Sequence, residues 1–524
     1  MIRTVGSTIA VSVFLWCFAA GGRGQSQQAY KMLQLFEWVG NHYVDTVNLS
    51  RLSERMIRKT LQELDPHSVY VSRDEVRTMN ERLEGSFEGI GMSCDWLNDT
   101  ALVVSTVSGG PAEKTGIRRG DRIVVIDGDT VAGKNLKMEH IIKRIRGKKG
   151  TKVRLAIFRK GGGELLQFTV TRDRIPDFSV NAAYRVSGKT GYIRLNRFAA
   201  SSHREFTEAL QKLRKEGVVD IILDLTGNGG GYVDMAVQLA DEFFDKGRLI
   251  VYTEGRNSGR VNYTSLAGGD FRKGKLVVMI NENSASASEI FAGAIQDWDR
   301  GMIVGRRSFG KGLVQRQMLF ADSSALRLTI ARYHTPTGRV IQKPYGDGGE
   351  YEKEIRNRLQ SGELTGETAV KINDSLQFKT LVKGRTVYGG GGIIPDVFVP
   401  LDTSYYTDYY KKLLERNILE WFILEYVDKN RSALERKYPD FSKFERDFRV
   451  SDAMPDDLRR FALQKGIDGK PEEAERSRER LQVRMKAYIA LCLWSDNEFY
   501  RIINRQEPIF LKALEVIADL QQNR

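Results

Sequence analysis

Two near-continuous apolar runs constrain the fold of this chain more than any other feature. They are Val218 to Leu225 and Lys275 to Ile280, and a stretch with helical character follows each of them. A strand that is apolar on both sides cannot face water, so it belongs in a sheet that is covered on both faces. The sequence therefore predicts an α/β core with a mixed sheet across residues 173–400.

The patterning on either side of this core predicts further domains. Residues 25–83 and 401–524 repeat apolar side chains at helical spacing, whereas residues 84–172 carry short β-rich runs separated by Gly and Asp-Gly turns. The 524 residues, 41% of them apolar, can build several hydrophobic cores. No apolar run reaches the roughly 18–20 residues that span a bilayer, which excludes a polytopic membrane protein. We expect a multi-domain α+β protein: the α/β core, an inserted β domain, and helical N- and C-terminal regions.

Residues 1–24 have the pattern of an export signal peptide. Arg3 supplies the positive start, and Thr8 to Ala20 forms the apolar stretch. Gly22 and Gly24 are small residues spaced for cleavage before Gln25. This pattern predicts an exported protein of the periplasm or cell envelope. An uncleaved membrane anchor is the alternative, for which the apolar stretch is short.

The net charge of +14 is concentrated in one segment. Lys114 to Arg174 holds 17 Lys and Arg against 6 Asp and Glu, a local excess of +11. An anionic ligand or an anionic surface would suit this segment, including a membrane contacted peripherally, and a plain solvated face is the alternative. Nucleic acid is the weakest candidate partner, because no stacking aromatics are interleaved with the basic residues. The three Cys residues lack zinc-ligand spacing, so we expect no metal site.

A glycine-rich turn opens the β region. Ser86 to Met92 reads S-F-E-G-I-G-M, and such a turn can aim successive backbone N–H groups at one anion. The terminal carboxylate of a peptide suits this arrangement, and the peptide then adds as a strand to the sheet edge. The predicted peptide-binding residues are Gly89, Ile90, Gly91 and Met92. The alternative is that Gly89 and Gly91 only shape a turn.

Three segments of the core carry candidate chemistry, and the first two end strands. Asp224 to Gly231 reads D-L-T-G-N-G-G-G, and its glycines allow backbone N–H groups to approach a ligand closely. Asn281 to Asp297 contains S-A-S-A-S-E at the start of an expected helix, where free N–H groups and the helix dipole stabilise an oxyanion. A plain turn in the first segment and helix capping by serine in the second are the alternatives.

The third segment is Ser308 to Gln315, which reads S-F-G-K-G-L-V-Q. The glycines around Lys311 indicate a backbone that packs closely against another segment. If residues 312–319 form a strand, Lys311 and Gln315 lie on the same face. A neutral lysine can activate a serine hydroxyl, although lowering its pKa from about 10.4 to ~7–8 costs roughly 4 kcal/mol.

These three segments together resemble the C-terminal processing peptidases, or tail-specific proteases, which are serine proteases with an inserted PDZ domain. The resemblance covers residues 64–400. Ser108 to Gly128, with S-G-G-P-A-E-K-T-G-I and G-D-R-I-V-V-I-D-G, resembles the PDZ domains of bacterial proteases. Further matching strings are L-D-P-H-S-x-Y at Leu64 to Tyr70, T-G-R-V-I-Q at Thr337 to Gln342 and G-G-I-I-P-D at Gly391 to Asp396.

The resemblance implies a role for each catalytic residue. Ser286 would be the nucleophile, Lys311, 25 positions later, the general base, and Gln315 the residue that orients the lysine. The oxyanion donors would be the N–H groups of Ala287 and Gly230. The resemblance also implies acyl transfer without a cofactor.

The sequence departs from the family beside the oxyanion turn. The family usually has Arg-Asn where this chain has Thr226-Gly227, which bears on the identity of the second oxyanion donor. In related proteases an arginine of the PDZ domain couples peptide binding to assembly of the active site. Arg146 is the candidate here.

The predicted function is therefore an exported serine endopeptidase that cleaves proteins near their C-termini, with the PDZ domain recognising the tail. A catalytic His triad is disfavoured because none of the five His has a catalytic type of context. A non-catalytic peptide-binding scaffold on a protease fold is the remaining alternative. An adaptor protein is a candidate partner. We also expect a homo-oligomer, since the last helix is apolar on one face and nothing in the sequence obviously covers it.

Overall fold

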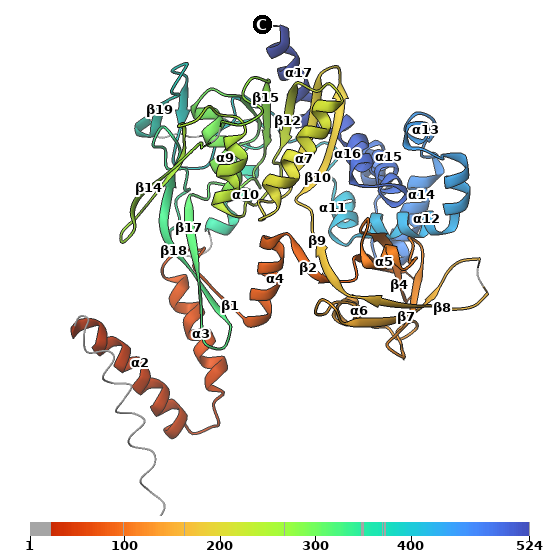
Figure 1. The fold of residues 1–524 in the computed structure, drawn as a ribbon, viewed down its shortest axis with the longest axis horizontal. Helices are drawn as coiled ribbons and strands as arrows, with labels where there is room; N and C mark the ends of the chain where they lie inside the picture. The colour runs from red at the N-terminus through yellow and green to blue at the C-terminus, as the bar shows by residue number, and fades with distance from the viewer. Residues whose placement is uncertain are drawn as a thin grey trace, which may run out of the picture. The chain divides into compact units, whose positions relative to one another are not determined.

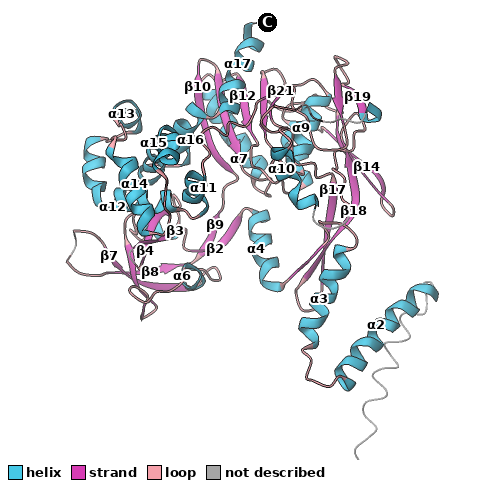
Figure 2. Cartoon of the chain, turned by 180° about the vertical axis from the view of Figure 1, so that it is seen from behind, coloured by secondary structure: helices cyan, strands magenta, loops and turns pink. Residues whose placement is uncertain are grey.

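The computed structural model describes residues 23–97, 99–161, 163–266, 268–346, 350–368, 370 and 374–522. The chain divides into two compact units, residues 1–73 with 315–329 and residues 74–314 with 330–524. Figure 1 labels their elements, and Figure 2 distinguishes helices from strands. The predicted leader up to Gly22 lies outside the described residues. No helix within the described part is both long and apolar enough to cross a membrane.

The first unit is helical at its start and ends in a small sheet. It contains α2 (Arg23–His42), α3 (Leu49–Gln62), β1 (Val69–Val71) and the adjoining parts of β17 (Leu313–Leu319) and β18 (Ala325–His334). Strand β1 runs antiparallel to β18, with Tyr70 opposite Leu326. The sequence predicted only helices over residues 25–83, so β1 is a difference. Its V-Y-V residues favour a strand, and the strand forms because a distant segment pairs with it.

The core of the second unit is a six-stranded sheet in the order β10-β11-β12-β15-β16-β21. Strands β10 and β11 are antiparallel, and each later neighbouring pair is parallel. The carboxyl ends of the parallel strands therefore meet at one edge. The bounds are β10 (Val180–Ser187), β11 (Thr190–Leu195), β12 (Asp220–Asp224), β15 (Leu276–Ile280), β16 (Met302–Gly305) and β21 (Val397–Phe398).

Helices cover both faces of this sheet, which confirms the expectation from the apolar runs. On β15, Val278 and Ile280 pack with helices α7 (Ser202–Lys215), α8 (Val233–Asp241) and α9 (Ala287–Asp297). Val277 and Met279 point to the opposite face and pack with α17 (Pro508–Gln522). Successive side chains of a strand alternate between faces, so a strand between two helical layers is apolar at nearly every position.

The last helix is where one expectation is wrong. Helix α17 was expected to expose an apolar face, yet Ile509, Phe510, Ala513 and Ile517 are buried against the core sheet. The Phe510 ring contacts the ring of Tyr192 edge-on, with centroids 5.4 Å apart. The sheet needs a cover on this face, and α17 supplies it from the far end of the chain. The argument that this helix mediates self-association therefore falls away.

The remaining elements form a β domain, a helical region and connecting pieces, and none contributes to the central sheet. The β domain has β3 (Met92–Leu97) at one edge of a sheet in the order β3-β4-β5-β7-β8, with β6 paired to β5. Arg122 of this domain pairs with Asp428 of the helical region at 2.8 Å.

The bounds in the β domain and beside it are α4 (Arg73–Glu84), β2 (Ser86–Gly89), β4 (Thr100–Thr106), α5 (Pro111–Lys114), β5 (Arg122–Ile126), β6 (Asp129–Thr130), α6 (Met138–Ile145), β7 (Lys152–Phe158), β8 (Leu166–Thr171) and β9 (Asp173–Pro176). Those of the core periphery are β13 (Leu249–Gly255), β14 (Gly259–Thr264), α10 (Glu350–Gln360), η1 (Asp374–Leu376), β19 (Gln377–Lys379) and β20 (Thr386–Tyr388). Those of the helical region are α11 (Asp408–Glu415), α12 (Ile418–Lys437), α13 (Phe441–Asp447), α14 (Ala453–Gln464), α15 (Pro471–Leu493), α16 (Asp496–Ile503) and η2 (Asn504–Gln506).

The packing of α17 predicts a stability difference between two adjacent residues. Phe510→Ala removes a buried ring and is expected to lower the free energy of unfolding by about 3–5 kcal/mol. Leu511→Ala is the matched control, because Leu511 is 42% exposed, and its effect should stay within about 0.5 kcal/mol. Urea unfolding of both variants measures the difference. Equal effects would mean that α17 does not dock on the sheet.

Candidate functional site

Ser286 lies between the end of β15 and the first turn of α9. Its backbone has φ 56° and ψ −114°, a conformation that residues with a side chain rarely adopt. Of the three serines in S-A-S-A-S-E, Ser284 and Ser288 are fully buried, and their hydroxyls donate to the carbonyl oxygens of Leu225 and Asn228 at 2.8 Å. Ser286 alone is partly exposed. Ser284 and Ser288 therefore form buried hydrogen bonds to the glycine-turn segment, and only the middle serine, Ser286, is accessible from outside.

The glycine turn after β12 lies directly against Ser286. A Cβ atom added to Gly230 would come within 2.8 Å of the Ser286 Cβ and 2.9 Å of the Ala287 nitrogen, and the residue has φ +97°. Only glycine allows this approach. The structure thus brings together the two predicted oxyanion donors. In this arrangement the Gly230 N–H donates to Asn228 Oδ1 at 2.9 Å.

A fully buried carboxylate connects the Ser286 turn to the lysine loop. Oε2 of Glu289 accepts the backbone N–H of Ser286 at 2.8 Å and that of Lys311 at 2.9 Å. Its Oε1 accepts the Gly310 N–H at 2.7 Å and the Ser308 hydroxyl at 2.5 Å. Burial raises the pKa of Glu289 to about 7, and the four donors oppose that rise. One carboxylate therefore holds both catalytic candidates by their backbones.

The Tyr333 hydroxyl is a second connection between the same two residues. It contacts the carbonyl oxygen of Ser286 at 3.2 Å and that of Lys311. Burial raises the pKa of Tyr333 well above its ordinary value, so the hydroxyl keeps its proton and donates. Ser286 and Lys311 are thus held at their N–H groups by Glu289 and at their carbonyls by Tyr333.

The glycines on either side of Lys311 pack as closely as the sequence indicated. A Cβ at Gly312 would lie 2.8 Å from the Gln342 nitrogen, and one at Gly310 would lie 3.1 Å from the Gly392 nitrogen. Lys311 itself is half-buried rather than enclosed. Gln315 belongs to the first compact unit, where its Nε2 donates to Thr329 Oγ1 at 3.4 Å.

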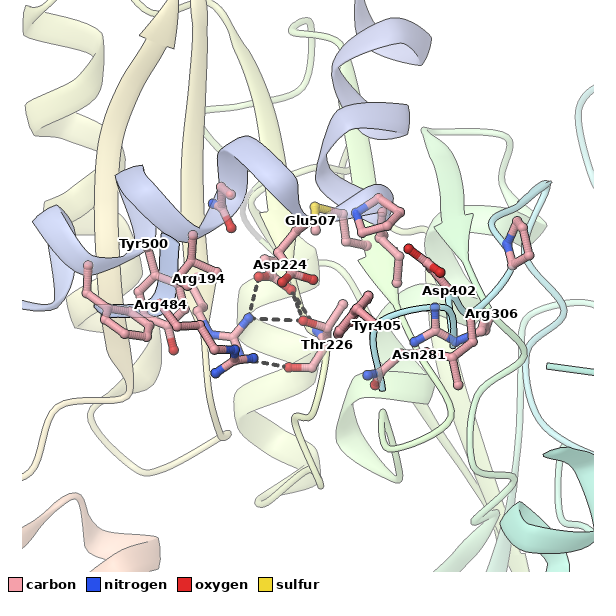
Figure 3. A pocket seen from close by; sticks show the side chains of 18 residues that line it. Arg194, Asp224, Thr226, Asn281, Arg306, Asp402, Tyr405, Arg484, Tyr500 and Glu507 are labelled. Atoms are coloured by element: carbon pink, nitrogen blue, oxygen red, sulfur yellow. Dashed lines mark hydrogen bonds and ion pairs between the residues drawn. The ribbon is translucent and has the colours of Figure 1, made fainter. Parts of the chain in front are cut away.

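Arg194 is bound to both ends of the segment from Asp224 to Thr226, with which the glycine turn begins. From the neighbouring strand β11, its guanidinium donates to the Asp224 carboxylate, to Thr226 Oγ1 at 3.0 Å and to the Thr226 carbonyl at 2.9 Å. Figure 3 shows this cluster in the wall of a cavity of about 350 Å³ at the carboxyl edge of the sheet. A guanidinium from a different strand thereby anchors the start of the glycine turn.

The predicted peptide-binding turn of the β domain is only partly open. Ile90 is 2% exposed and belongs to the domain core, and its carbonyl accepts the Ala112 N–H at 2.8 Å. Gly91 has φ +74°, and its carbonyl accepts the Val107 N–H at 2.9 Å. Gly89 ends β2, and Met92 begins β3, whose outer edge has no strand partner within the described part of the sheet.

Arg146 and two of the histidines have other partners. Arg146 donates to Glu81 Oε2 on α4 at 2.6 Å, and its guanidinium lies over the Phe87 ring. His203 pairs with Glu242, and His334 stacks on Tyr252. Among the described residues, no group of three or more His, Cys, Asp or Glu side chains is arranged to hold a metal ion.

The sequence did not reveal three residues of this site: Glu289, Tyr333 and Arg194. Glu289 was visible as the final letter of S-A-S-A-S-E, three positions after Ser286, where a capping carboxylate is expected. Tyr333 and Arg194 carry no local signal, because each reaches the site from a strand that is distant in sequence.

Comparison with known proteins places these segments among peptidases. Residues 189–348 match Peptidase family S41, residues 102–159 match a PDZ domain, and residues 409–495 match a family of unknown function (DUF8443). A probable CtpA-like serine protease of Staphylococcus aureus is 34% identical over 348 residues, covering 65% of this chain and 69% of the relative. One from Staphylococcus haemolyticus is 34% identical over 344 residues, covering 65% and 68%. Among solved structures, a photosystem II D1 C-terminal processing protease is 28% identical and covers 59% of this chain and 89% of its own, with a TM-score of 0.33.

The raised pKa of Glu289 predicts a pH dependence of stability. Because the folded pKa of about 7 exceeds the ordinary value of 4.5, the folded chain holds a proton that the unfolded chain has released. The stability that this proton contributes is fully present below pH 4.5 and is lost as the pH rises through 7, at up to about 1.4 kcal/mol per pH unit. Unfolding of wild type and Glu289→Gln across pH 4.5–8 measures it. Parallel curves would show that the carboxyl has an ordinary pKa.

The Arg194 cluster predicts a second stability effect. Asp224 is 2% exposed, so Arg194→Leu leaves a buried carboxylate without its cation and is expected to cost about 3–5 kcal/mol. Arg256→Leu, at an exposed arginine, serves as the control and should have almost no effect. Thermal unfolding of the two variants measures the difference. Equal melting temperatures would mean that the Arg194 contacts do not stabilise the fold.

Proposed function

Since the chain belongs to the CtpA-like serine proteases of peptidase family S41, with a PDZ domain, we propose that it cleaves proteins near their C-termini with a Ser286/Lys311 dyad. The observation that carries this proposal is that Glu289 and Tyr333 hold the backbones of both residues. A non-catalytic scaffold would have no need of such a buried, fully bonded arrangement around one accessible serine.

The proposed reaction is acyl transfer. Neutral Lys311 takes the Ser286 proton as the serine oxygen attacks a backbone carbonyl, and Gln315 orients the lysine amine. The lysine then protonates the leaving amine, and water hydrolyses the acyl-enzyme. The start of α9 favours the developing negative charge through its dipole. No step requires a cofactor.

The Ala287 and Gly230 N–H groups are the proposed oxyanion donors. No backbone carbonyl within the described residues accepts the Ala287 N–H, and we propose that this group donates to the oxyanion. The Gly230 N–H is bound by Asn228, so it can serve only after the Asn228 side chain releases it. We propose that substrate binding brings about this change, and that the arrangement described here is a resting one.

The PDZ domain is the proposed receptor for the substrate tail. An extended C-terminus would add to the outer edge of β3, and its carboxylate would bind the backbone N–H groups from Gly89 to Met92. Arg146 is the proposed link between peptide binding and the active site, which requires it to leave Glu81. The substrates are proteins with free C-terminal tails, and nucleic acid is not a partner.

The cellular setting completes the proposal. The predicted leader places the protein outside the cytoplasmic membrane, in the periplasm or cell envelope. An adaptor protein and peripheral contact of the basic PDZ segment with a membrane are proposed partners, and self-association remains a proposal without the support of α17.

Cleavage of an unfolded reporter with an apolar free C-terminus tests the proposal. Ser286→Ala and Lys311→Ala should each lower kcat/KM roughly a thousandfold or more, because either change removes a member of the dyad. Amidation of the reporter's C-terminus should raise KM. Ser187→Ala and Lys189→Ala, at exposed residues, are the controls. Full activity in Lys311→Ala would exclude the dyad, and indifference to amidation would exclude tail recognition.

A further inference from the structure

The sheet of the PDZ domain has an outer face that points away from the domain's own core. Across β3, β4 and β5, Asp95 lies opposite Leu102, and Leu102 lies opposite Arg122, so these three side chains share that face. Val103 and Ile123 point the other way, into the PDZ core. The outer face of such a sheet is usually solvated and polar. Leu102 is nevertheless only 3% exposed, so another part of the protein covers it.

The helical region, from α11 to η2, supplies this cover. Leu97 and Leu102 belong to the same buried apolar cluster as Leu419, Ile423 and Val427 of α12, and β3 lies against that helix. The two leucines are 6% and 3% exposed, although neither contributes to the PDZ core. Removing their apolar surface from water favours the contact. The PDZ sheet is thus buried on one face by its own core and on the other by α12.

Polar contacts surround this apolar patch. Arg122 pairs with Asp428 of α12 at 2.8 Å, and their side chains are only 21% and 11% exposed. The ammonium group of Lys160, just after β7, donates to the carbonyl oxygen of Asp428 at 3.1 Å. The PDZ domain therefore binds Asp428 through both its carboxylate and its backbone.

The end of α15 forms a second polar attachment. Arg119 of the PDZ domain donates to the carbonyl oxygens of Leu491 and Cys492 at 3.4 Å, and Arg431 of α12 donates to that of Cys492 at the same distance. The last carbonyls of a helix have no partner within the helix and carry the negative end of its dipole, so two arginines can share them. A Cβ atom at Gly120 would lie 3.4 Å from Arg431 Nε, which shows how closely the two backbones approach.

The same helical region is bonded to the core sheet. Oδ1 of Asn497, on α16, accepts the Ala183 N–H of β10 at 2.7 Å, and Asn504 donates to the Tyr184 hydroxyl of the same strand at 2.9 Å. The chain itself enters and leaves the PDZ domain through β2 and β9, which pair only as a two-stranded ribbon. A two-stranded ribbon is marginally stable by itself and holds a domain weakly. The helical region therefore provides the firmer connection.

We propose that the helical region, most of which matches a family of unknown function, fixes the PDZ domain on the protease core, so that cleavage falls at a set number of residues from the substrate's C-terminus. The docking follows from the contacts above, and the set spacing rests on the proposed function. A PDZ domain in a constant position delivers the same stretch of an extended tail to Ser286. A domain that pivoted on its ribbon would deliver a range of positions.

The docking is tested by the distance between two nitroxide labels in the full chain. The labelled sites are Lys134→Cys in the PDZ domain and Lys212→Cys on α7, both at exposed residues, in a Cys17→Ser background. Burial raises the pKa of Cys94 to about 12 and that of Cys492 to about 11, so these two thiols stay unlabelled. Electron paramagnetic resonance should give one narrow distance peak.

Charge reversal at the Arg122–Asp428 pair should release the domain. Arg122→Glu sets two carboxylates against each other in a largely buried contact, and the distance peak should broaden. Asp428→Asn, which keeps the shape and removes the charge, gives the same test without a repelling pair. Arg122→Glu combined with Asp428→Arg should restore the narrow peak. Arg154→Glu, at an exposed arginine of β7, is the matched control and should leave the peak unchanged. A peak that stays narrow in both single variants, or that stays broad in the swapped pair, overturns the docking.

The set spacing is tested by mass spectrometry of the cleavage products. Unfolded reporters that differ only in the length of a spacer before the same apolar C-terminus should be cut by wild type at a constant number of residues from the end. Arg122→Glu should spread the cuts over several positions, and the swapped pair should narrow them again. Cuts that stay at one sequence while the spacer lengthens overturn the spacing. A wild type that cuts no reporter overturns the proposed function and the spacing with it, whereas the label distances still decide the docking.

Discussion

The buried carboxylate of Glu289 is the interaction on which the candidate active site depends. Removing a carboxylate from water costs several kcal/mol unless donors surround it. Here four donors do so, and they come from two segments, the Ser286 turn and the loop from Ser308 to Lys311. The carboxylate cannot be satisfied unless both segments are in place. Its own burial thus requires the two catalytic candidates to be assembled together.

The parallel sheet makes this assembly geometrically feasible. Strands β12, β15 and β16 end at one edge, so the segments that follow them meet there. The Gly230 backbone packs against Ser286 because glycine has no side chain. The Tyr333 hydroxyl, on β18, donates to the Ser286 carbonyl oxygen. The positive φ of Ser286 persists because these neighbours define its position from several sides. The backbone conformation of Ser286 is thus held by its tertiary neighbours rather than by local preference.

Local sequence predicted the strands well and the partners of side chains poorly. The apolar runs identified β12 and β15 because a strand that is buried on both faces is apolar over most of its length. The three serines of S-A-S-A-S-E could not be told apart from their spacing, since which one is exposed depends on whether Leu225 and Asn228 offer acceptors nearby. Likewise, nothing in the sequence near Thr226 indicates that Arg194 of the adjacent strand donates to its hydroxyl and its carbonyl.

The sequence by itself determined the order of domains, the buried strands, the glycines that permit close backbone contact, and the family resemblance that singled out Ser286 and Lys311. These are properties of short segments, set by periodicity, steric freedom and motif. Only the tertiary structure decided that α17 covers the core sheet, that Glu289 and Tyr333 join the two candidates, and that the outer face of the PDZ sheet packs on the helical region. Each of these contacts joins residues that are far apart in the chain. Such a contact stabilises the protein only after folding has brought its residues together and removed them from water.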